Sequence, residues 1–182
     1  TGIGGGLLID GRLRRGAHGL AGEVGHVVLD PTGPECTCGN RGCVESFASG
    51  PSIAREALFA LERSPARGSK LRELAAGRGR VTGVDVFAAA AAGDDLAAEV
   101  LDREITWLGI GIAGAVKLVD PEIVVIGGGV SKAGDQFFRP LTAAVDAHVA
   151  PLEAGMVPVV PGQLTDDANL FGAAAVAEQE SG

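Results

Sequence analysis

Positive charge is scarce in this sequence. Its 15 lysines and arginines are outnumbered by 23 aspartates and glutamates, which gives a formal net charge of −8. A surface dedicated to nucleic acid or to an anionic membrane needs a positive field, so we expect this chain to bind neither directly. Long hydrophobic runs are also lacking. The stretch most worth testing as a membrane span, residues 105–116, contains glycine and is well short of the roughly 20 residues required, so we expect no membrane anchor.

Cysteine is rare, and all of it lies in one place. The three cysteines fall between positions 36 and 43, so they cannot form the framework of a disulfide-stabilised secreted domain. We therefore expect a reducing compartment, and the cytoplasm is the predicted location. The chain opens at Thr1 without an initiator methionine, a basic segment or a cleavage site, so we also expect a fragment without a secretory signal peptide.

The rest of the composition is that of a globular protein. Of 182 residues, 46% are hydrophobic and 21% are charged, which excludes a disordered segment. In the first part of the chain, Asp-Gly at 10–11 between two β-branched runs predicts a hairpin. A helical pattern follows the cysteines with Pro51 near its start, and residues 64–83 predict a loop around one short helix at 71–75.

A long helix is predicted over residues 96–118, where apolar residues recur with a period near 3.6. Gly109, Gly111 and Gly114 inside it weaken helix propensity, so we expect them to allow close packing. The other expected elements are helices at 84–92, 137–149 and 168–178 and a strand at 157–160.

An apolar strand at 123–126 leads directly into a run of three glycines. We expect a buried parallel strand entering a glycine loop, and the alternation of strands and helices predicts an α/β fold. Glycine after a strand lets backbone N–H groups approach phosphate oxygens. The pattern alone is equally compatible with a plain tight turn.

Four metal-ligating side chains lie within eighteen residues: His26, Cys36, Cys38 and Cys43. Three thiolates and an imidazole make a closed tetrahedral zinc shell, and two glycines between the last two cysteines permit the tight reversal that such a shell needs. The alternative is three separate buried thiols and an unrelated histidine. Four protein ligands leave no position for an activated water, so we expect a structural metal.

Two carboxylates flank this cluster, Glu23 before His26 and Glu45 after Cys43. Each could be an ordinary capping or solvated acid. Held rigidly beside a metal loop, they could instead accept hydrogen bonds from a polyhydroxylated ligand, which requires charged acceptors at fixed positions.

These motifs resemble the signature of the ROK family (repressors, open reading frames and kinases). Residues 22–26 read GEVGH and residues 36–45 read CTCGNRGCVE, which match the family's ExGH and CxCGxxGCxE motifs. The resemblance extends to the opening TGIGGG, to IGGGVS at 126–131 and to LFGAA at 170–174. It therefore spans nearly the whole chain and is weakest over 60–95.

The resemblance implies an α/β chain with the actin-like ATPase (ribonuclease H-like) fold. Residues 1–182 would form its C-terminal lobe with a zinc-binding loop, and a closing helix at 168–182 would pack on the missing N-terminal lobe. It also implies an ATP-dependent hexose kinase that resembles glucokinases. The family's DxGxT-type phosphate loop and its catalytic aspartate are not visible here, so we expect no catalytic base in this chain.

The resemblance also implies the roles of individual residues and the cofactors Zn²⁺, ATP and Mg²⁺. The zinc ligands would be His26, Cys36, Cys38 and Cys43. The contacts to sugar hydroxyls would come from Glu23, His26 and Glu45. The nucleotide would lie against Thr1, Gly2, Gly4, Gly127, Gly128 and Gly129.

Two other functions stay open at this point. ROK members include transcriptional repressors, which carry an N-terminal helix-turn-helix and use the same lobe as a sugar sensor. A zinc-stabilised interaction module without a ligand is the third reading. We favour the kinase because the glycine pattern on the phosphate side is intact. Glucose is the first candidate hexose, with mannose, fructose and N-acetylated hexosamines open, and the family suggests a homodimer or homotetramer.

Overall fold

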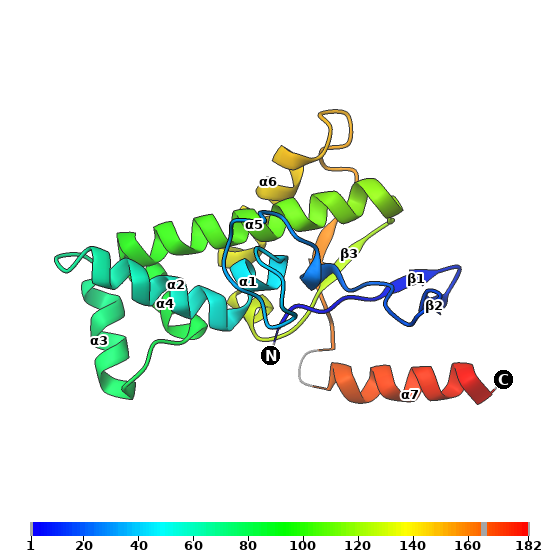
Figure 1. The fold of residues 1–182 in the computed structure, drawn as a ribbon, viewed down its shortest axis with the longest axis horizontal. Coiled ribbons are helices and arrows are strands. Elements are labelled where there is room, and N and C mark those ends of the chain that lie inside the picture. The colour runs from blue at the N-terminus through cyan, green and yellow to red at the C-terminus, as the bar shows by residue number, and fades with distance from the viewer. Residues whose placement is uncertain (1, 165–166, 182) are drawn as a thin grey trace.

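A long central helix, α5 (Asp95–Val119), organises the fold, as the computed structural model of residues 2–164 and 167–181 shows (Figure 1). The carboxylate of Asp94 caps its start by accepting the N–H groups of Leu96 and Ala97, both at 3.1 Å. Its end lies at Asp120, which adopts the left-handed conformation before a proline. The long helix expected from the sequence is confirmed.

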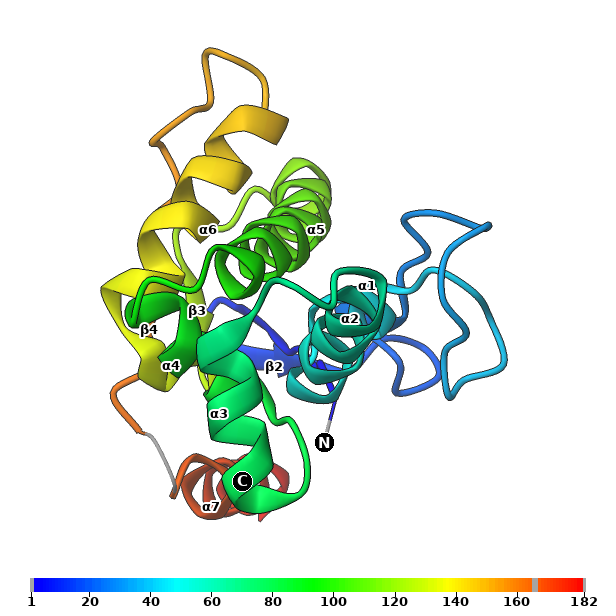
Figure 2. The same ribbon diagram turned by 90° about the vertical axis from the view of Figure 1, so that its left-hand side faces the viewer.

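Helix α6 (Asp135–His148) packs along α5 (Figure 2). A Cβ added at Gly109 would lie 2.5 Å from the Cβ of Ala144, and one at Gly111 would lie 2.8 Å from a methyl group of Val44. Close packing therefore explains these two glycines. It does not explain Gly114, which faces open space.

Three shorter helices pack against α5: α1 (Val44–Ala48), α2 (Gly50–Arg63) and α4 (Gly83–Ala91). A fourth, α3 (Ser69–Arg78), packs on α4. Pro51 lies in the first turn of α2, as expected. Helix α3 is longer than the expected 71–75 because left-handed glycines at 68 and 79 define its two ends, and Leu71 is fully buried.

The described residues form two small sheets. Strands β1 (Leu7–Ile9) and β2 (Arg12–Arg14) make the expected antiparallel hairpin, and β3 (Val124–Ile126) pairs in parallel with β4 (Val159–Pro161). The expectation that the strand at 123–126 is buried is wrong, because Val125 is 58% exposed. Its outer face carries no covering element in the described part of the chain. The described residues also include the 3₁₀ helices η1 (Val24–His26) and η2 (Val130–Ala133).

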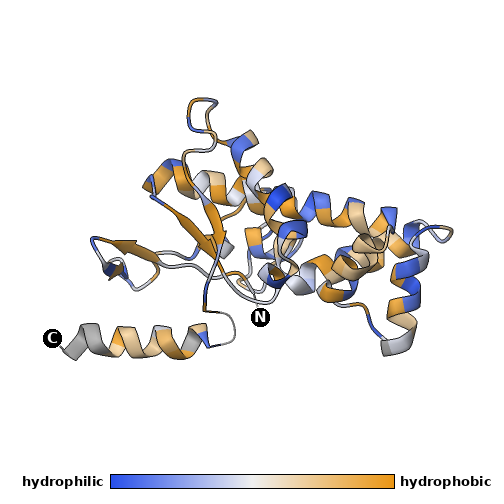
Figure 3. Ribbon diagram, turned by 180° about the vertical axis from the view of Figure 1, so that it is seen from behind, coloured by the Kyte–Doolittle hydropathy of each residue, from blue (hydrophilic) through white to orange (hydrophobic). Residues whose placement is uncertain are grey.

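The last helix, α7 (Ala168–Ser181), is apolar yet exposed. Leu170 is 72% exposed and Phe171 is 57% exposed, and Figure 3 shows hydrophobic residues along this helix. Figure 1 places it apart from the other helices. Within the described ranges, none of the helices combines the length and the apolar composition that crossing a bilayer requires.

Candidate functional site

A histidine and three cysteines meet beside the start of α1. His26 ends η1, Cys36 and Cys38 lie in the loop that follows, and Cys43 is the residue immediately before α1. The four donor atoms all lie within 4.8 Å of one another. The structure thus brings together the four residues that the sequence singles out as metal ligands.

The spacing of these atoms fits a tetrahedral zinc ion. The sulfur atoms of Cys38 and Cys43 are 3.7 Å apart, and Nδ1 of His26 lies 3.6 Å from the sulfur of Cys36. Zinc–sulfur bonds of about 2.3 Å and zinc–nitrogen bonds of about 2.0 Å separate two sulfurs by about 3.8 Å and a sulfur from a nitrogen by about 3.5 Å. The observed distances agree with both values.

Backbone hydrogen bonds fold the cysteine loop into this shape. The N–H of Cys36 donates to the carbonyl of Asn40 at 2.8 Å, and the N–H of Gly39 donates to the carbonyl of Cys36 at 3.0 Å. Gly39 and Gly42 have φ values of +93° and +66°, which glycine adopts without strain. A Cβ at Gly42 would also overlap the carbonyl of Asp30. Both glycines are therefore required by the loop.

Two of the thiols differ in acidity. The backbone N–H of Asn40 lowers the pKa of the Cys38 thiol to about 7, whereas burial raises the pKa of the Cys43 thiol to about 12. Metal ions bind the thiolate form, so the binding of a cation here releases protons.

Glu23 lies near Nε2, the ring nitrogen of His26 that does not face the thiols. Its Oε2 is 3.9 Å from Nε2 of His26, while Nδ1 of the same ring faces the thiols. This distance is too long for a hydrogen bond, so the carboxylate does not by itself fix the orientation of the ring. About half of the Glu23 side chain is exposed, so its oxygens are accessible to a ligand.

Glu45 is held from two sides. It lies in the first turn of α1, where its Oε2 accepts the N–H of Ile3 at 2.9 Å and its Oε1 accepts the hydroxyl hydrogen of Thr37 at 3.3 Å. Its backbone carbonyl accepts the hydroxyl hydrogen of Ser52 at 2.9 Å. The carboxylate therefore has a defined position relative to the cysteine loop and to the start of the chain.

The glycine-rich opening segment contacts both sides of this site. A Cβ at Gly2 would overlap the carboxylate of Glu45, and one at Gly25, beside His26, would overlap the carbonyl of Ile3. Gly4 faces open space. Close packing against Glu45 thus explains why residue 2 is a glycine, whereas the backbone at Gly4 is open to a ligand.

The second glycine loop directly follows β3. A Cβ at any of the glycines 127–129 would meet open space, and the glycine at 128 has a φ of +89°. Val130, the next residue, lies against Gly50 at the start of α2. Thr1, also expected at the nucleotide, lies outside the described residues.

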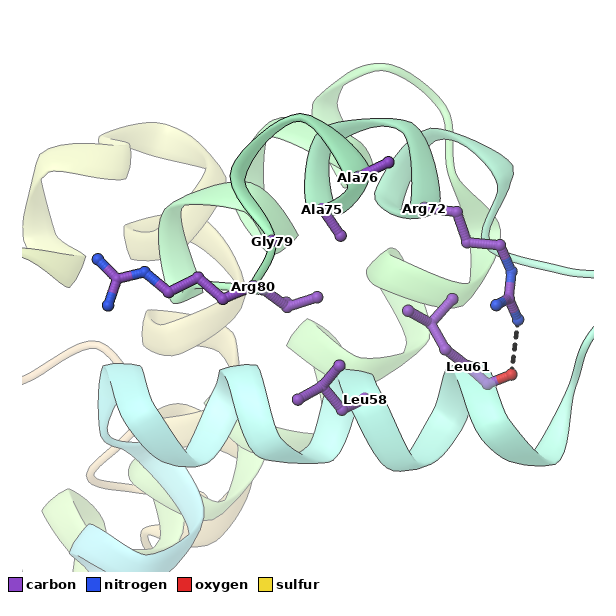
Figure 4. Close-up of a pocket in the computed structure, with 8 residues that line it drawn as sticks. Leu58, Leu61, Arg72, Ala75, Ala76, Gly79 and Arg80 are labelled. Carbon is purple, nitrogen blue, oxygen red and sulfur yellow. Dashed lines mark hydrogen bonds between the residues drawn. The ribbon is translucent and has the colours of Figure 1, made fainter.

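A separate cavity of about 460 Å³ opens between α2 and α3, elements that carry none of the four cluster residues (Figure 4). Leu58 and Leu61 line it from α2, and Ala75 lines it from α3. The guanidinium of Arg72 donates to the carbonyl of Leu61 at 2.6 Å. The lining contains no carboxylate.

Comparison with known proteins identifies the family. The family model described as ROK family matches residues 1–180. The chain belongs to the ROK family. It is 38% identical over 182 residues to a glucokinase of Thermotoga maritima, a match that covers 100% of this chain and 57% of that protein. The chain therefore spans little more than half the length of this relative.

Solved ROK structures share the fold. A ROK family glucokinase from Streptomyces griseus, in complex with glucose and AMPPNP, matches with a TM-score of 0.89 and 34% identity over 98% of this chain and 58% of that one. A ROK family transcriptional regulator, a homolog of the E. coli MLC protein, matches with a TM-score of 0.73 and 31% identity over 88% of this chain and 39% of that one. The expected α/β fold of the actin-like ATPase type is confirmed.

Sequence reasoning missed the two partners of Glu45. Thr37 lies between Cys36 and Cys38, and this place between two candidate ligands is a signal that could have pointed to it. Nothing in the sequence signals Ile3, because it contributes a main-chain N–H. The sugar and nucleotide roles expected for individual ROK residues stay predictions.

Proposed function

We propose that the full-length protein transfers a phosphoryl group from ATP to a hydroxyl of a hexose, and that this chain supplies the sugar-binding and zinc-binding part. The observation that carries this proposal is the three-cysteine, one-histidine cluster with Glu23 and Glu45 beside it. The likeness to glucokinases over the whole chain supports it.

The zinc ion would be held by His26, Cys36, Cys38 and Cys43. Their donor spacing fits a four-coordinate ion, and a full protein shell leaves no open position for a reacting water. The metal supplies rigidity. It fixes the loop that carries Thr37 and the start of the helix that carries Glu45.

The sugar would be oriented by charged acceptors. Glu23 and Glu45 each accept hydrogen bonds from hydroxyl groups, and Nε2 of His26 offers a further polar contact. Hydrogen bonds to charged groups contribute about 1.5–3 kcal/mol each, so two or three of them fix both affinity and orientation. Orientation lowers the barrier because the attacking hydroxyl is held in line with the phosphoryl group.

ATP would bind across the two glycine loops. Gly4 and the glycines at 127–129 leave backbone open to phosphate and nucleoside, and Mg²⁺ would neutralise charge on the phosphates. The proton of the sugar hydroxyl would pass to an aspartate of the N-terminal lobe, as the family resemblance implies. This chain's own contribution is positioning.

We also propose that residues 1–182 form one lobe and that α7 packs on the other. Large apolar side chains are normally buried, whereas Leu170 and Phe171 of α7 are largely exposed in this chain. Replacing both by serine should lower the melting temperature of the full-length protein. An unchanged melting temperature would contradict the packing.

The protein is further proposed to be a cytoplasmic homodimer or homotetramer. The thiol cluster supports a reducing compartment, because oxidation of its cysteines would abolish metal binding. Light scattering of the full-length protein measures its oligomeric state, and a monomeric mass would contradict this proposal.

The deciding experiment uses the full-length protein in a coupled assay of ADP release with glucose, mannose, fructose and N-acetylated hexosamines, alongside metal analysis. We expect turnover with at least one hexose and one zinc per chain. Glu45→Gln should lower kcat/KM by roughly 10–100-fold, the loss of one charged hydrogen bond. Glu35→Gln is the matched control, since Glu35 lies next to Cys36 in the cysteine loop and its carboxylate pairs with Arg41 at 2.9 Å rather than with Thr37 or Ile3.

Two other outcomes distinguish the alternatives. Sugar binding in calorimetry without ADP release would favour the sensor function, to which the similarity with a ROK transcriptional regulator also points. Zinc binding with no response to any sugar would leave an interaction module, and the kinase proposal would be wrong.

A further inference from the structure

Thr37 lies between two residues of the metal cluster. Its neighbours on either side, Cys36 and Cys38, both contribute thiols to the cluster, so a bound metal would fix its backbone from both directions. The side chain of Thr37 is exposed, and its hydroxyl donates a hydrogen bond to Oε1 of Glu45 at 3.3 Å. The cysteine loop and the carboxylate are therefore linked through one hydroxyl group.

The second oxygen of Glu45 has a different kind of partner. Oε2 accepts the main-chain N–H of Ile3 at 2.9 Å, and this segment is packed so closely that Gly2 has no room for a side chain against the carboxylate. A carboxylate with a donor on each oxygen has one preferred orientation. About four lone-pair positions belong to an ionised carboxylate, so those not used by Thr37 and Ile3 remain for a ligand.

We propose that Thr37 is a positioning residue that orients the carboxylate of Glu45 toward the sugar, an inference that rests on the proposed function. A carboxylate that is ordered before the sugar arrives loses little freedom on binding, so the sugar binds more tightly. The hydroxyl suits this role because its own backbone is anchored by the cysteines. Without it, Oε1 of Glu45 loses its side-chain donor and only Oε2 remains fixed.

The test compares Thr37→Val with Thr37→Ser in the full-length protein. Valine keeps the shape of threonine and removes the hydroxyl, whereas serine keeps the hydroxyl. We expect Thr37→Val to raise the sugar KM and the sugar Kd by about 3–10-fold, as for the loss of one long hydrogen bond to a charged group. The KM for ATP and the zinc content should stay at their wild-type values, and kcat should change by less than the sugar KM. Thr37→Ser should restore the sugar KM.

Thr32 provides the matched control. It is an exposed threonine near the start of the cysteine loop, and its hydroxyl donates to a carboxylate at 2.7 Å, but that carboxylate belongs to Asp30. Thr32→Val therefore removes an equivalent hydrogen bond without touching Glu45. Its sugar KM should equal that of the wild type.

An unchanged sugar KM and Kd in Thr37→Val, with zinc retained, would overturn the proposal. So would a loss of zinc from that variant, because Thr37 would then support the metal loop rather than Glu45. Crystal structures of the wild type and Thr37→Val separate this inference from the proposed function. If the wild type binds no sugar, the kinase proposal fails, and the positioning role still stands or falls on whether Oε1 of Glu45 moves in the variant.

Discussion

Replacing Glu104 with glutamine should stabilise the folded protein at alkaline pH. Glu104 lies in α5 and is 1% exposed. Its Oε1 accepts the Nε–H of Arg103 at 2.8 Å, whereas its Oε2 is buried and has no hydrogen-bond partner in the described part of the chain. Burial raises the pKa of Glu104 to about 7, with Arg103 and Arg55 acting in the opposite direction and Glu56 in the same one.

The magnitude follows from linkage between protonation and folding. The ordinary pKa of a glutamate is 4.5, so between pH 4.5 and about 7 the folded state binds more protons than the unfolded state. Stability therefore falls as the pH rises through that window. The cost of ionising Glu104 is about 1.4 kcal/mol at pH 5.5 and about 3 kcal/mol at pH 8.5. Glutamine cannot ionise and avoids this cost.

The assay is denaturant unfolding of the full-length protein at both pH values. Relative to the wild type, Glu104→Gln should gain about 2 kcal/mol more at pH 8.5 than at pH 5.5. Glu99→Gln is the control in the same helix, because Arg67 lowers the pKa of the exposed Glu99. Its stability should fall slightly and equally at both pH values, since Glu99 is ionised throughout. A Glu104→Gln variant whose difference from the wild type does not change with pH would refute the reasoning.

Three further predictions concern packing, capping and the metal. Gly109→Ala should lower the free energy of unfolding by about 1–3 kcal/mol, because the added methyl group overpacks against α6. Gly114 in the same helix faces open space, so Gly114→Ala should raise the free energy of unfolding by up to about 1 kcal/mol. Equal effects of the two variants in urea unfolding would contradict this reasoning. Asp94→Ala should cost about 2–4 kcal/mol, because three backbone N–H groups lose their acceptor, and a loss below 1 kcal/mol would speak against it. Removing zinc with a chelator should lower the melting temperature and shift the fluorescence of Trp107, which stacks on Phe47 of α1 at 4.4 Å, and zinc but not magnesium should reverse both changes.

Much of the secondary structure could be predicted from local patterns. The Asp-Gly pair marked the hairpin, and periodicity marked α5, because turn chemistry and helix amphipathicity are properties of neighbouring residues. The exposure of Val125 could not be predicted in this way. The sequence pattern of an apolar strand is the same whether or not another part of the protein covers the strand.

The glycines show the same limit more sharply. Gly109 and Gly114 lie in one helix and look alike in the sequence, yet only Gly109 approaches another helix closely. Likewise, Gly2 and Gly4 belong to one motif, but Gly2 packs against Glu45 and Gly4 faces open space. Which glycine is needed for packing depends on residues far away along the chain.

The sequence by itself determined the family and singled out the four residues of the candidate metal cluster, because the two short motifs that carry both lie within residues 22–45. It named Glu23 and Glu45 as acids near the cluster. Only the tertiary structure decided how Glu45 is held, since its donors are the main-chain N–H of Ile3, 42 positions away, and the hydroxyl of Thr37. Hydrogen bonds between distant segments depend on the packing of the folded chain, and no local pattern encodes them.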